Sequence, residues 1–206
     1  MARLTADFFD RDTVTAAQAL LGKYLVRRTA AGDLVCRLTE TEAYVGAIDK
    51  ACHAYGGRHT PRTETLYAAP GTTYVYLIYG MHHCLNFVTE PEGTASAVLI
   101  RGAVPVQGLE AMAQNRFGRS LAELTAYQRK NFCSGPGKLC RAMAVTRAEN
   151  ALPLGNDALY LCDSLPGLPP AAISRIHTGK RIGIDYAGEA VDFPWRFWTE
   201  ETDVAF

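Results

Sequence analysis

A carboxylate and a phenol ring stand two residues apart at Glu42 and Tyr44, at the end of an alternating run that starts at Leu34. Alternate side chains of a β-strand share a face, so the two are predicted to line one pocket. A carboxylate beside a flat ring suits cleavage of a bond between a planar heterocycle and a reacting carbon. The pattern leaves a second interpretation open, in which Glu42 is an ion-pair partner at a strand end and Tyr44 borders the core.

The same alternation predicts that Leu34, Cys36 and Leu38 share a face with Glu40 and Glu42. That face begins apolar and ends polar. Such a change indicates a strand that leaves the core and enters a cleft.

Residues 73–88 predict a β-hairpin that is rich in tyrosine. Tyr74 and Tyr76 share one face, whereas Tyr79 lies on the other, next to the turn, and Met81 follows it. A bulky ring at an exposed tip can wedge into a base stack and fill the gap that an extruded nucleotide leaves. Tyrosine also favours strands in general, so an ordinary hairpin is the alternative interpretation.

A glycine-rich segment at 135–137 precedes Lys138 and predicts the start of a helix. Backbone N–H groups at a helix start, together with a lysine, can hold a phosphate. The G-x-x-x-x-G-K-[ST] spacing of a Walker loop is absent. A plain helix-entry turn is the alternative.

Asp49 and His53 come closest to a metal-ligand pair, but no H-x-x-x-H, H-E-x-x-H or C-x-x-C motif accompanies them. We therefore expect neither a metal nor another cofactor. The cysteines are predicted to be reduced thiols that fill the core. They are Cys36, Cys52, Cys84, Cys133, Cys140 and Cys162.

Periodicity and turn residues predict an α+β protein with one domain over residues 1–206. Asp12 is predicted to cap a helix that Gly22 closes. The loop-rich segment 45–73 is long enough to indicate a functional loop. Helices are predicted over 106–130 and 134–145, and strands over 23–28, 34–44, 97–102, 181–184 and 196–198.

Lysine plus arginine and aspartate plus glutamate each number 21, which argues against a strongly basic, histone-like protein. The basic residues are nevertheless clumped, as at Arg58 and Arg62, which allows a small positive footprint. The chain starts without an apolar signal segment and contains no run of about 18 apolar residues. We therefore expect a cytoplasmic protein that is not secreted and has no membrane partner.

Several runs together resemble the alkyladenine (3-methyladenine) DNA glycosylase family, and the similarity covers nearly the whole chain. The carboxylate strand and the tyrosine hairpin, in this order, are its specific signals. The runs are Glu40-Thr41-Glu42-Ala43-Tyr44, Ala51-Cys52-His53, Arg58-His59-Thr60-Pro61-Arg62, Tyr74-Val75-Tyr76-Leu77-Ile78-Tyr79-Gly80-Met81, Asn86, Val98-Leu99-Ile100-Arg101, Gly135-Pro136-Gly137-Lys138-Leu139-Cys140 and Arg181-Ile182-Gly183.

The resemblance implies a curved, mostly antiparallel β-sheet with flanking helices and a protruding hairpin, similar to the C-terminal domain of methionyl-tRNA formyltransferase. It implies a monofunctional DNA glycosylase in base excision repair. Such an enzyme flips alkylated or deaminated purines, 3-methyladenine among them, from duplex DNA and hydrolyses the N-glycosidic bond. A monomer associated with a bacterial nucleoid is expected, and the lesion range stays open.

The resemblance also implies roles for single residues. Glu42 would deprotonate a water that attacks C1′, while Arg101 and the main-chain carbonyl of Ile182 would help to hold that water. One carboxylate suffices where alkylation has made the base a cationic leaving group, because a general acid is then less needed. The base pocket would comprise Tyr44, His53, Tyr76 and Asn86, and the DNA contacts Tyr79, Met81, Arg58, Thr60, Arg62 and Lys138.

Two other functions fit parts of the sequence. A non-catalytic RNA-binding module is the main alternative, given the resemblance in fold to the formyltransferase domain. A hydrolase of free nucleosides would not need the Tyr79 wedge. No lysine adjoins Glu42 on its strand, which predicts hydrolysis without lyase activity. The sequence departs from the family at the hairpin residues His82-His83 and at Leu66, in a loop expected near the opposite DNA strand.

Overall fold

The sheet is built around one long strand, β3 (Gly32–Tyr44), in a computed structural model that describes residues 2–200. The other strands are β1 (Ala2–Arg3), β2 (Tyr24–Thr29), β4 (Thr73–Ile78), β5 (His82–Thr89), β6 (Ser96–Gln107), β7 (Leu159–Ser164), β8 (His177–Gly179) and β9 (Arg196–Trp198). Their order is β1-β7-β2-β3-β6-β5-β4, with antiparallel pairing, and β8 pairs with β9. β9 also pairs with Glu40–Glu42 of β3, so late residues of the chain reach the predicted site.

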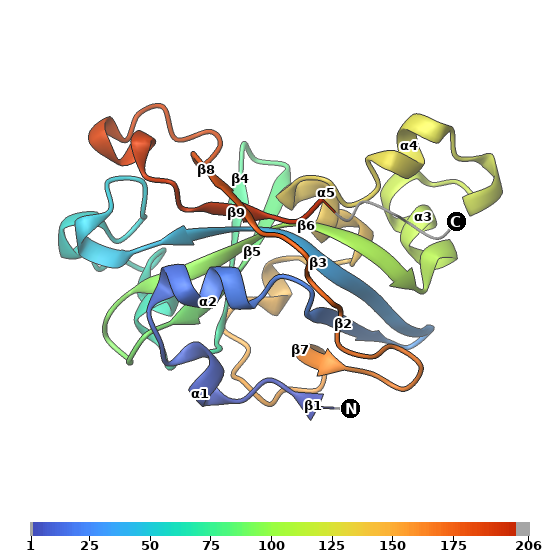
Figure 1. Ribbon diagram of the computed structural model, residues 1–206, viewed down its shortest axis with the longest axis horizontal. Coiled ribbons are helices and arrows are strands. Elements are labelled where there is room, and N and C mark those ends of the chain that lie inside the picture. Colours follow the sequence, from blue (N-terminus) through green and yellow to red (C-terminus); the bar gives the residue numbers. More distant parts are fainter. Residues whose placement is uncertain (1, 201–206) are drawn as a thin grey trace.

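Short helices flank the sheet (Figure 1). The α-helices are α1 (Ala6–Phe9), α2 (Thr13–Ala19), α3 (Leu109–Phe117), α4 (Ala126–Lys130) and α5 (Pro136–Ala142), and turns of 3-10 helix span Gly46–Ile48, Tyr55–Gly57, Glu64–Tyr67, Leu121–Glu123, Arg147–Glu149 and Gly188–Asp192. Asp12 caps α2 as predicted, because its carboxylate accepts a hydrogen bond from the N–H of Thr15 at 2.8 Å.

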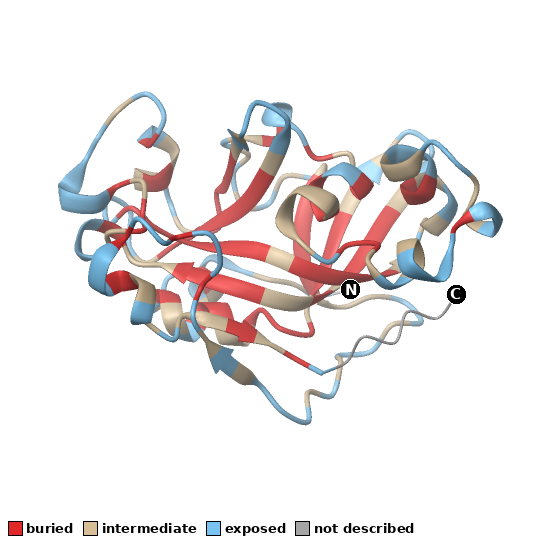
Figure 2. Ribbon diagram, turned by 90° about the horizontal axis from the view of Figure 1, so that it is seen from above, coloured by how far each residue is buried: buried red, intermediate tan, exposed pale blue. Residues whose placement is uncertain are grey.

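The main core lies between the sheet and the helices α2, α3 and α5. Phe9, Leu20, Met112 and Leu139 are fully buried there. Burial of a side chain of this size stabilises the fold by about 1.5–3 kcal/mol. The cysteines are buried free thiols, as predicted. Figure 2 shows that burial is concentrated in the central strands and that the outer loops are exposed.

β3 changes face near its middle, which corrects the predicted alternation. Leu38 points into the main core, but the core face continues at Ala43 and not at Glu42. The cause is a pair of register shifts at one level of the sheet, where Thr39 of β3 and Arg101 of β6 have no partner in the ladder. Each extra residue reverses the side to which later side chains point. Glu42 therefore faces away from the main core, and the prediction that it shares a face with Leu38 is wrong.

Three predicted elements differ from those observed. The helix predicted over 106–130 is interrupted. Gly118 ends α3 at a φ of 65°, and capping boxes at Ser120 and Thr125 begin two new helical segments. Residues 106 and 107 belong to β6, and α5 ends three residues before the predicted limit at 145. Residues 181–184 form a loop and not a strand. The N–H of Ile182 donates to the side chain of Glu42 and not to a backbone carbonyl of a neighbouring strand.

β4 and β5 form the predicted hairpin, which projects beside α5 (Figure 1). The N–H of Met81 donates to the carbonyl of Ile78 at 3.2 Å, around Tyr79 and Gly80 with φ of 53° and 71°. Positive φ at both central positions is typical of the type I′ turn, which matches the twist of the strands. Tyr79 and Met81 are 80% and 70% exposed, so the tip presents two apolar side chains to solvent.

The described chain is thus one α+β domain with a mostly antiparallel open sheet, flanking helices and a protruding hairpin, as predicted. The likeness to the formyltransferase domain stays a prediction. Over residues 2–200, no helix has the length and hydropathy needed to cross a bilayer.

Candidate active site

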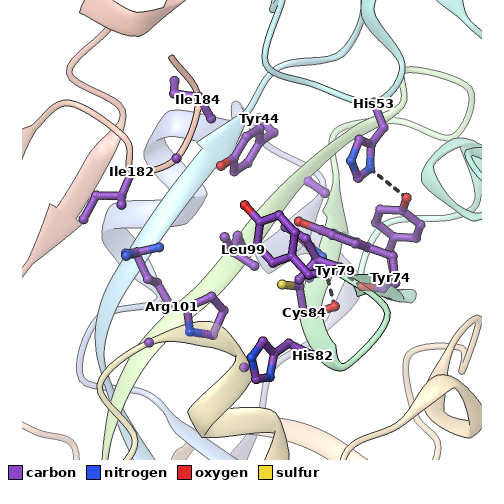
Figure 3. A pocket seen from close by; sticks show the side chains of 18 of the residues that line it. Tyr44, His53, Tyr74, Tyr79, His82, Cys84, Leu99, Arg101, Ile182 and Ile184 are labelled. Carbon is purple, nitrogen blue, oxygen red and sulfur yellow. Dashed lines mark hydrogen bonds between the residues drawn. The ribbon is translucent and has the colours of Figure 1, made fainter. Parts of the chain in front are cut away.

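A cavity of about 870 Å³ lies between the hairpin, the sheet and the loops that carry His53 and Ile182 (Figure 3). Its volume is in the range of sites for small ligands. Within residues 2–200, no aspartate or glutamate is among the residues that line it. The aromatic and basic lining residues are Tyr44, His53, Arg62, Tyr74, Tyr76, Tyr79, His82, Arg101, Arg116, Phe117, Lys138, Arg141 and Tyr186.

Glu42 lies directly behind this wall and is fully buried. Its Oε1 accepts a hydrogen bond from the Ile182 N–H at 2.9 Å, and its Oε2 accepts one from the Tyr44 hydroxyl at 2.9 Å. Nε of Arg101 is 3.6 Å from Oε1. The carboxylate is therefore held by three groups that themselves line the cavity.

Burial raises the pKa of Glu42, because the low-dielectric interior disfavours the ionised carboxylate. The charge of Arg101 and the two hydrogen bonds counteract this effect, and the charge of Glu40 adds to it. The net direction is upward. A carboxylate with a raised pKa binds a proton more tightly, which is what a general base requires.

The loop that carries Ile182 is anchored by a buried ion pair. Arg181 donates from its terminal nitrogens to both oxygens of Asp49, at 2.5 and 2.8 Å, and both side chains are 0% exposed. It also donates to the carbonyl of Ala43 at 2.8 Å, and its guanidinium lies 4.7 Å from the centre of the Tyr44 ring. This one arginine thus fixes the loop against β3, next to Glu42.

A group of rings forms the opposite part of the wall. His53 Nδ1 and the Tyr74 hydroxyl are 2.9 Å apart, and the His53 ring meets the edge of Tyr76 at a centroid distance of 4.7 Å. Arg62 donates to His53 Nε2 at 3.2 Å, so Nδ1 carries the proton and donates to Tyr74. Burial, and to a lesser extent the Arg62 charge, lower the pKa of His53 to about 4. His53 is therefore neutral near pH 7.

Comparison with known proteins identifies the family. Residues 7–203 match the family model for methylpurine-DNA glycosylase. The chain belongs to this family. It is 51% identical over 200 residues to a protein of Clostridium perfringens strain 13, covering 97% of this chain and 96% of the relative. A Desulfitobacterium hafniense Y51 protein is 46% identical over 202 residues, covering 98% and 97%. Both relatives are provisionally named 3-methyladenine DNA glycosylase.

Most residues predicted for the methylpurine-DNA glycosylase site lie around the cavity. This holds for Tyr44, His53, Arg62, Tyr76, Tyr79, Asn86, Arg101, Lys138 and Ile182. The side-chain amide of Asn86, on β5, donates to the carbonyl of Tyr74, on β4, at 3.0 Å, which fixes its orientation. Ile182 presents its N–H to Glu42, whereas the prediction concerned its carbonyl, whose role stays untested.

Other predicted residues lie apart from the cavity lining. Met81 stands at the hairpin tip. Arg58 is exposed, and Thr60 takes part in a local turn in which its N–H donates to the Thr63 hydroxyl at 2.9 Å. Leu66, by contrast, is 2% exposed, packs in a small core and is among the residues that line the cavity, and its predicted place near the opposite DNA strand stays untested.

The sequence reasoning assigned no role to Glu40 or Tyr186 and placed Arg181 in a strand. The sequence signal for Arg181 was weak, because this residue lies between Lys180 and Ile182 with no acidic neighbour in the three residues on either side. The signal for Glu40 was its like charge two residues from Glu42, which requires basic partners in a folded chain. In the described part of the chain, no three His, Cys, Asp or Glu side chains are grouped to hold a metal ion.

Proposed function

We propose that this methylpurine-DNA glycosylase is a monofunctional hydrolase that acts on damaged purines flipped out of duplex DNA, with Glu42 as its general base. One observation carries the proposal. A buried carboxylate with a raised pKa lies behind a cavity lined by aromatic rings, next to an arginine. This arrangement suits water activation beside a flat base.

The proposed reaction needs one base and one good leaving group. Glu42 takes a proton from water as the water oxygen forms a bond to C1′. The C1′–N bond breaks, and its electron pair neutralises the positive charge of an alkylated purine. The sugar passes through an oxocarbenium-like state, which the nearby carboxylate stabilises. A neutral damaged base lacks this advantage, which is why alkylated purines such as 3-methyladenine are the proposed main substrates.

The aromatic wall favours a cationic base. Tyr44 and Tyr76 both line the cavity and are proposed to lie on the two faces of the purine, with His53 at its edge. A cation over such a ring gains about 0.5–2 kcal/mol. The side chain of Asn86 is proposed to crowd the 2-amino group of normal guanine, because its hydrogen bond to Tyr74 leaves it little freedom to move away.

The hairpin and the basic residues are proposed to bind the DNA. Tyr79 would fill the gap left by the flipped nucleotide, with Met81 widening the wedge. Arg58, Thr60, Arg62 and Lys138 would contact phosphates, and Arg116 and Arg141 extend the basic side of the cavity. We further propose that the enzyme acts as a monomer on DNA of the nucleoid in a bacterial cytoplasm. Light scattering of the free and the DNA-bound protein tests the proposed oligomeric state.

The decisive experiment is incubation with methylated duplex DNA under single-turnover conditions. Release of 3-methyladenine by the wild type and its loss in Glu42→Gln are expected, and release that persists in this variant would remove Glu42 from its role. Borohydride should trap no covalent enzyme–DNA adduct, since a trapped adduct indicates a lyase.

Two variants separate DNA handling from chemistry. Tyr79→Ser should slow the reaction on duplex more than on single-stranded DNA, because only duplex has a stack to open. Tyr127→Ser, at another exposed tyrosine outside the cavity, is the matched control. Affinity should fall steeply with salt if the basic residues meet phosphates, and a flat salt response contradicts this.

A further inference from the structure

Glu40 is fixed in the wall behind Glu42. Its side chain is 17% exposed and stands against Gly102. A Cβ added at Gly102 would come within 3.0 Å of the Glu40 Cβ and 3.2 Å of its Oε2. Contacts this short would require the Glu40 side chain to shift by a few tenths of an ångström, so the absence of a side chain at Gly102 leaves room for the carboxylate in its present position. Glu40 therefore has a defined position in the fold.

One oxygen of Glu40 accepts hydrogen bonds from two arginines. Oε1 accepts from Nε of Arg101 at 2.9 Å and from Nε of Arg196 at 2.6 Å. An arginine that is bound through Nε keeps its two terminal nitrogens for other acceptors. Arg101 lines the cavity, so these nitrogens are available to a group that enters it.

Arg101 lies between two carboxylates and is closer to Glu40. Its Nε is 2.9 Å from Oε1 of Glu40 and 3.6 Å from Oε1 of Glu42. Three strands meet here, because β3 supplies the glutamates, β6 supplies Arg101 and β9 supplies Arg196. If the Glu40 charge is removed, Glu42 is the carboxylate that still attracts Arg101. Opposite charges in a buried site attract strongly, so Arg101 is expected to move toward Glu42.

We propose that Glu40 is a positioning residue that holds Arg101 away from the Glu42 carboxylate. Glu42 then stays free to accept a proton from water, while the terminal nitrogens of Arg101 reach the water or the anionic group at the reacting sugar. The inference rests on the proposed role of Glu42 as the general base. Glu40 acts only through Arg101 and is not itself catalytic.

The test is Glu40→Gln, which keeps the shape of the side chain and removes its charge. The groups that face Glu42 are Glu40 and Tyr44 on β3, Cys84 on β5, Arg101 on β6, Arg196 paired opposite it on β9, and the amide of Ile182. The Glu40 charge raises the pKa of Glu42 and the Arg101 charge lowers it. Loss of the Glu40 charge and a closer approach of Arg101 both lower that pKa.

The expected result is a change in the pH profile and in the rate. The acid limb of the single-turnover rate should move to lower pH by about 0.5–1 unit, at or below the lower end of the roughly 1–3 units that a close charge produces, because the Glu40 charge is the smallest of the influences on the Glu42 pKa. The plateau rate should fall about tenfold, since a weaker and misplaced base loses part of the roughly 100-fold or larger gain from general base catalysis.

Arg196→Lys is the matched control. It removes the other hydrogen bond to Glu40 and alters the stacking of Arg196 on Trp198, but it keeps the charge and the Glu40–Arg101 bond. Its acid limb should stay at the wild-type pH, and melting temperatures verify that both variants are folded.

Two outcomes overturn the inference. One is a folded Glu40→Gln enzyme with the rate and pH profile of the wild type. The other is an equal loss of rate in Arg196→Lys without a shift of the limb in either variant, which indicates a merely structural role. Activity that survives Glu42→Gln is a separate result, because it refutes the proposed base and with it the proposed function.

Discussion

Replacement of Arg181 by methionine tests whether one buried ion pair holds the loop that carries Ile182. The guanidinium donates to both oxygens of Asp49 at 2.5 and 2.8 Å and to the carbonyls of Ala43 at 2.8 Å and Ala190 at 3.3 Å. Methionine has a similar length but no donor. Arg181→Met therefore leaves a buried carboxylate without its counter-charge.

The expected loss in the free energy of unfolding is about 3 kcal/mol. Removal of one partner from a buried ion pair costs roughly 3–5 kcal/mol. The lower end applies because Asp49 keeps two donors, the N–H groups of Val45 at 3.1 Å and Ala51 at 3.0 Å. In a domain of this size, the melting temperature should fall by about 6–12 °C.

Urea unfolding followed by circular dichroism measures the change. The double variant Asp49→Asn/Arg181→Met should be more stable than the sum of the two single effects predicts, by about 2 kcal/mol, because it contains no unpaired charge. A loss below about 1 kcal/mol in Arg181→Met, within the ordinary range of substitutions, would refute the reasoning. Strict additivity of the single effects would refute it as well.

Three further predictions concern pH. The Tyr44 hydroxyl donates to Glu42 and thereby lowers the Glu42 pKa, and Tyr44→Phe removes it. The acid limb of the single-turnover rate should therefore move to higher pH by about one unit, and an unmoved limb contradicts this. Because the pKa of Glu42 is raised in the folded state, the wild type loses stability as pH rises from the unfolded-chain pKa, about 4.3, through the raised pKa. Glu42→Gln should therefore gain stability relative to the wild type over this rise in urea titrations, and a constant difference counts against it. The pKa of His53 is lowered to about 4 by burial, so the unfolded chain takes up its proton first as pH falls below about 6.5; the wild type should lose about 3 kcal/mol more than His53→Asn between pH 7 and 4, and parallel pH curves for the two proteins contradict this.

Local patterns predicted much of the fold because several elements depend mainly on near neighbours. The cap of α2 at Asp12 and the hairpin around Tyr79 are both determined within a few residues. Gly118 ends α3 although the apolar periodicity of 106–130 continues beyond it, so periodicity alone predicted too long a helix. Residues 181–184 have the composition of a strand, yet the buried pair of Arg181 with Asp49 makes a loop of them.

The site was predictable as a set of residues but not as a geometry. Alternation placed Glu42 and Tyr44 together correctly, because no irregularity separates them. Alternation gave the wrong face for the residues before Thr39, because Thr39 is left out of the pairing together with Arg101 of β6. The sequence of β3 alone does not reveal an irregularity that depends on the neighbouring strand. Long-range partners such as Ile182 are invisible to any window of residues, and only the resemblance to a known family pointed to it.

The hydrogen bond between Glu42 and Ile182 joins residues that are 140 positions apart, and the Glu40–Arg196 bond spans 156. A chain emerging from the ribosome already contains the strand, the hairpin and most of the basic residues long before it contains these partners. The residues proposed to contact DNA are thus synthesised before the proposed catalytic centre is complete. We expect a nascent or truncated chain without residues 181–198 to be inert toward the glycosidic bond, so that base removal begins only when the fold is complete.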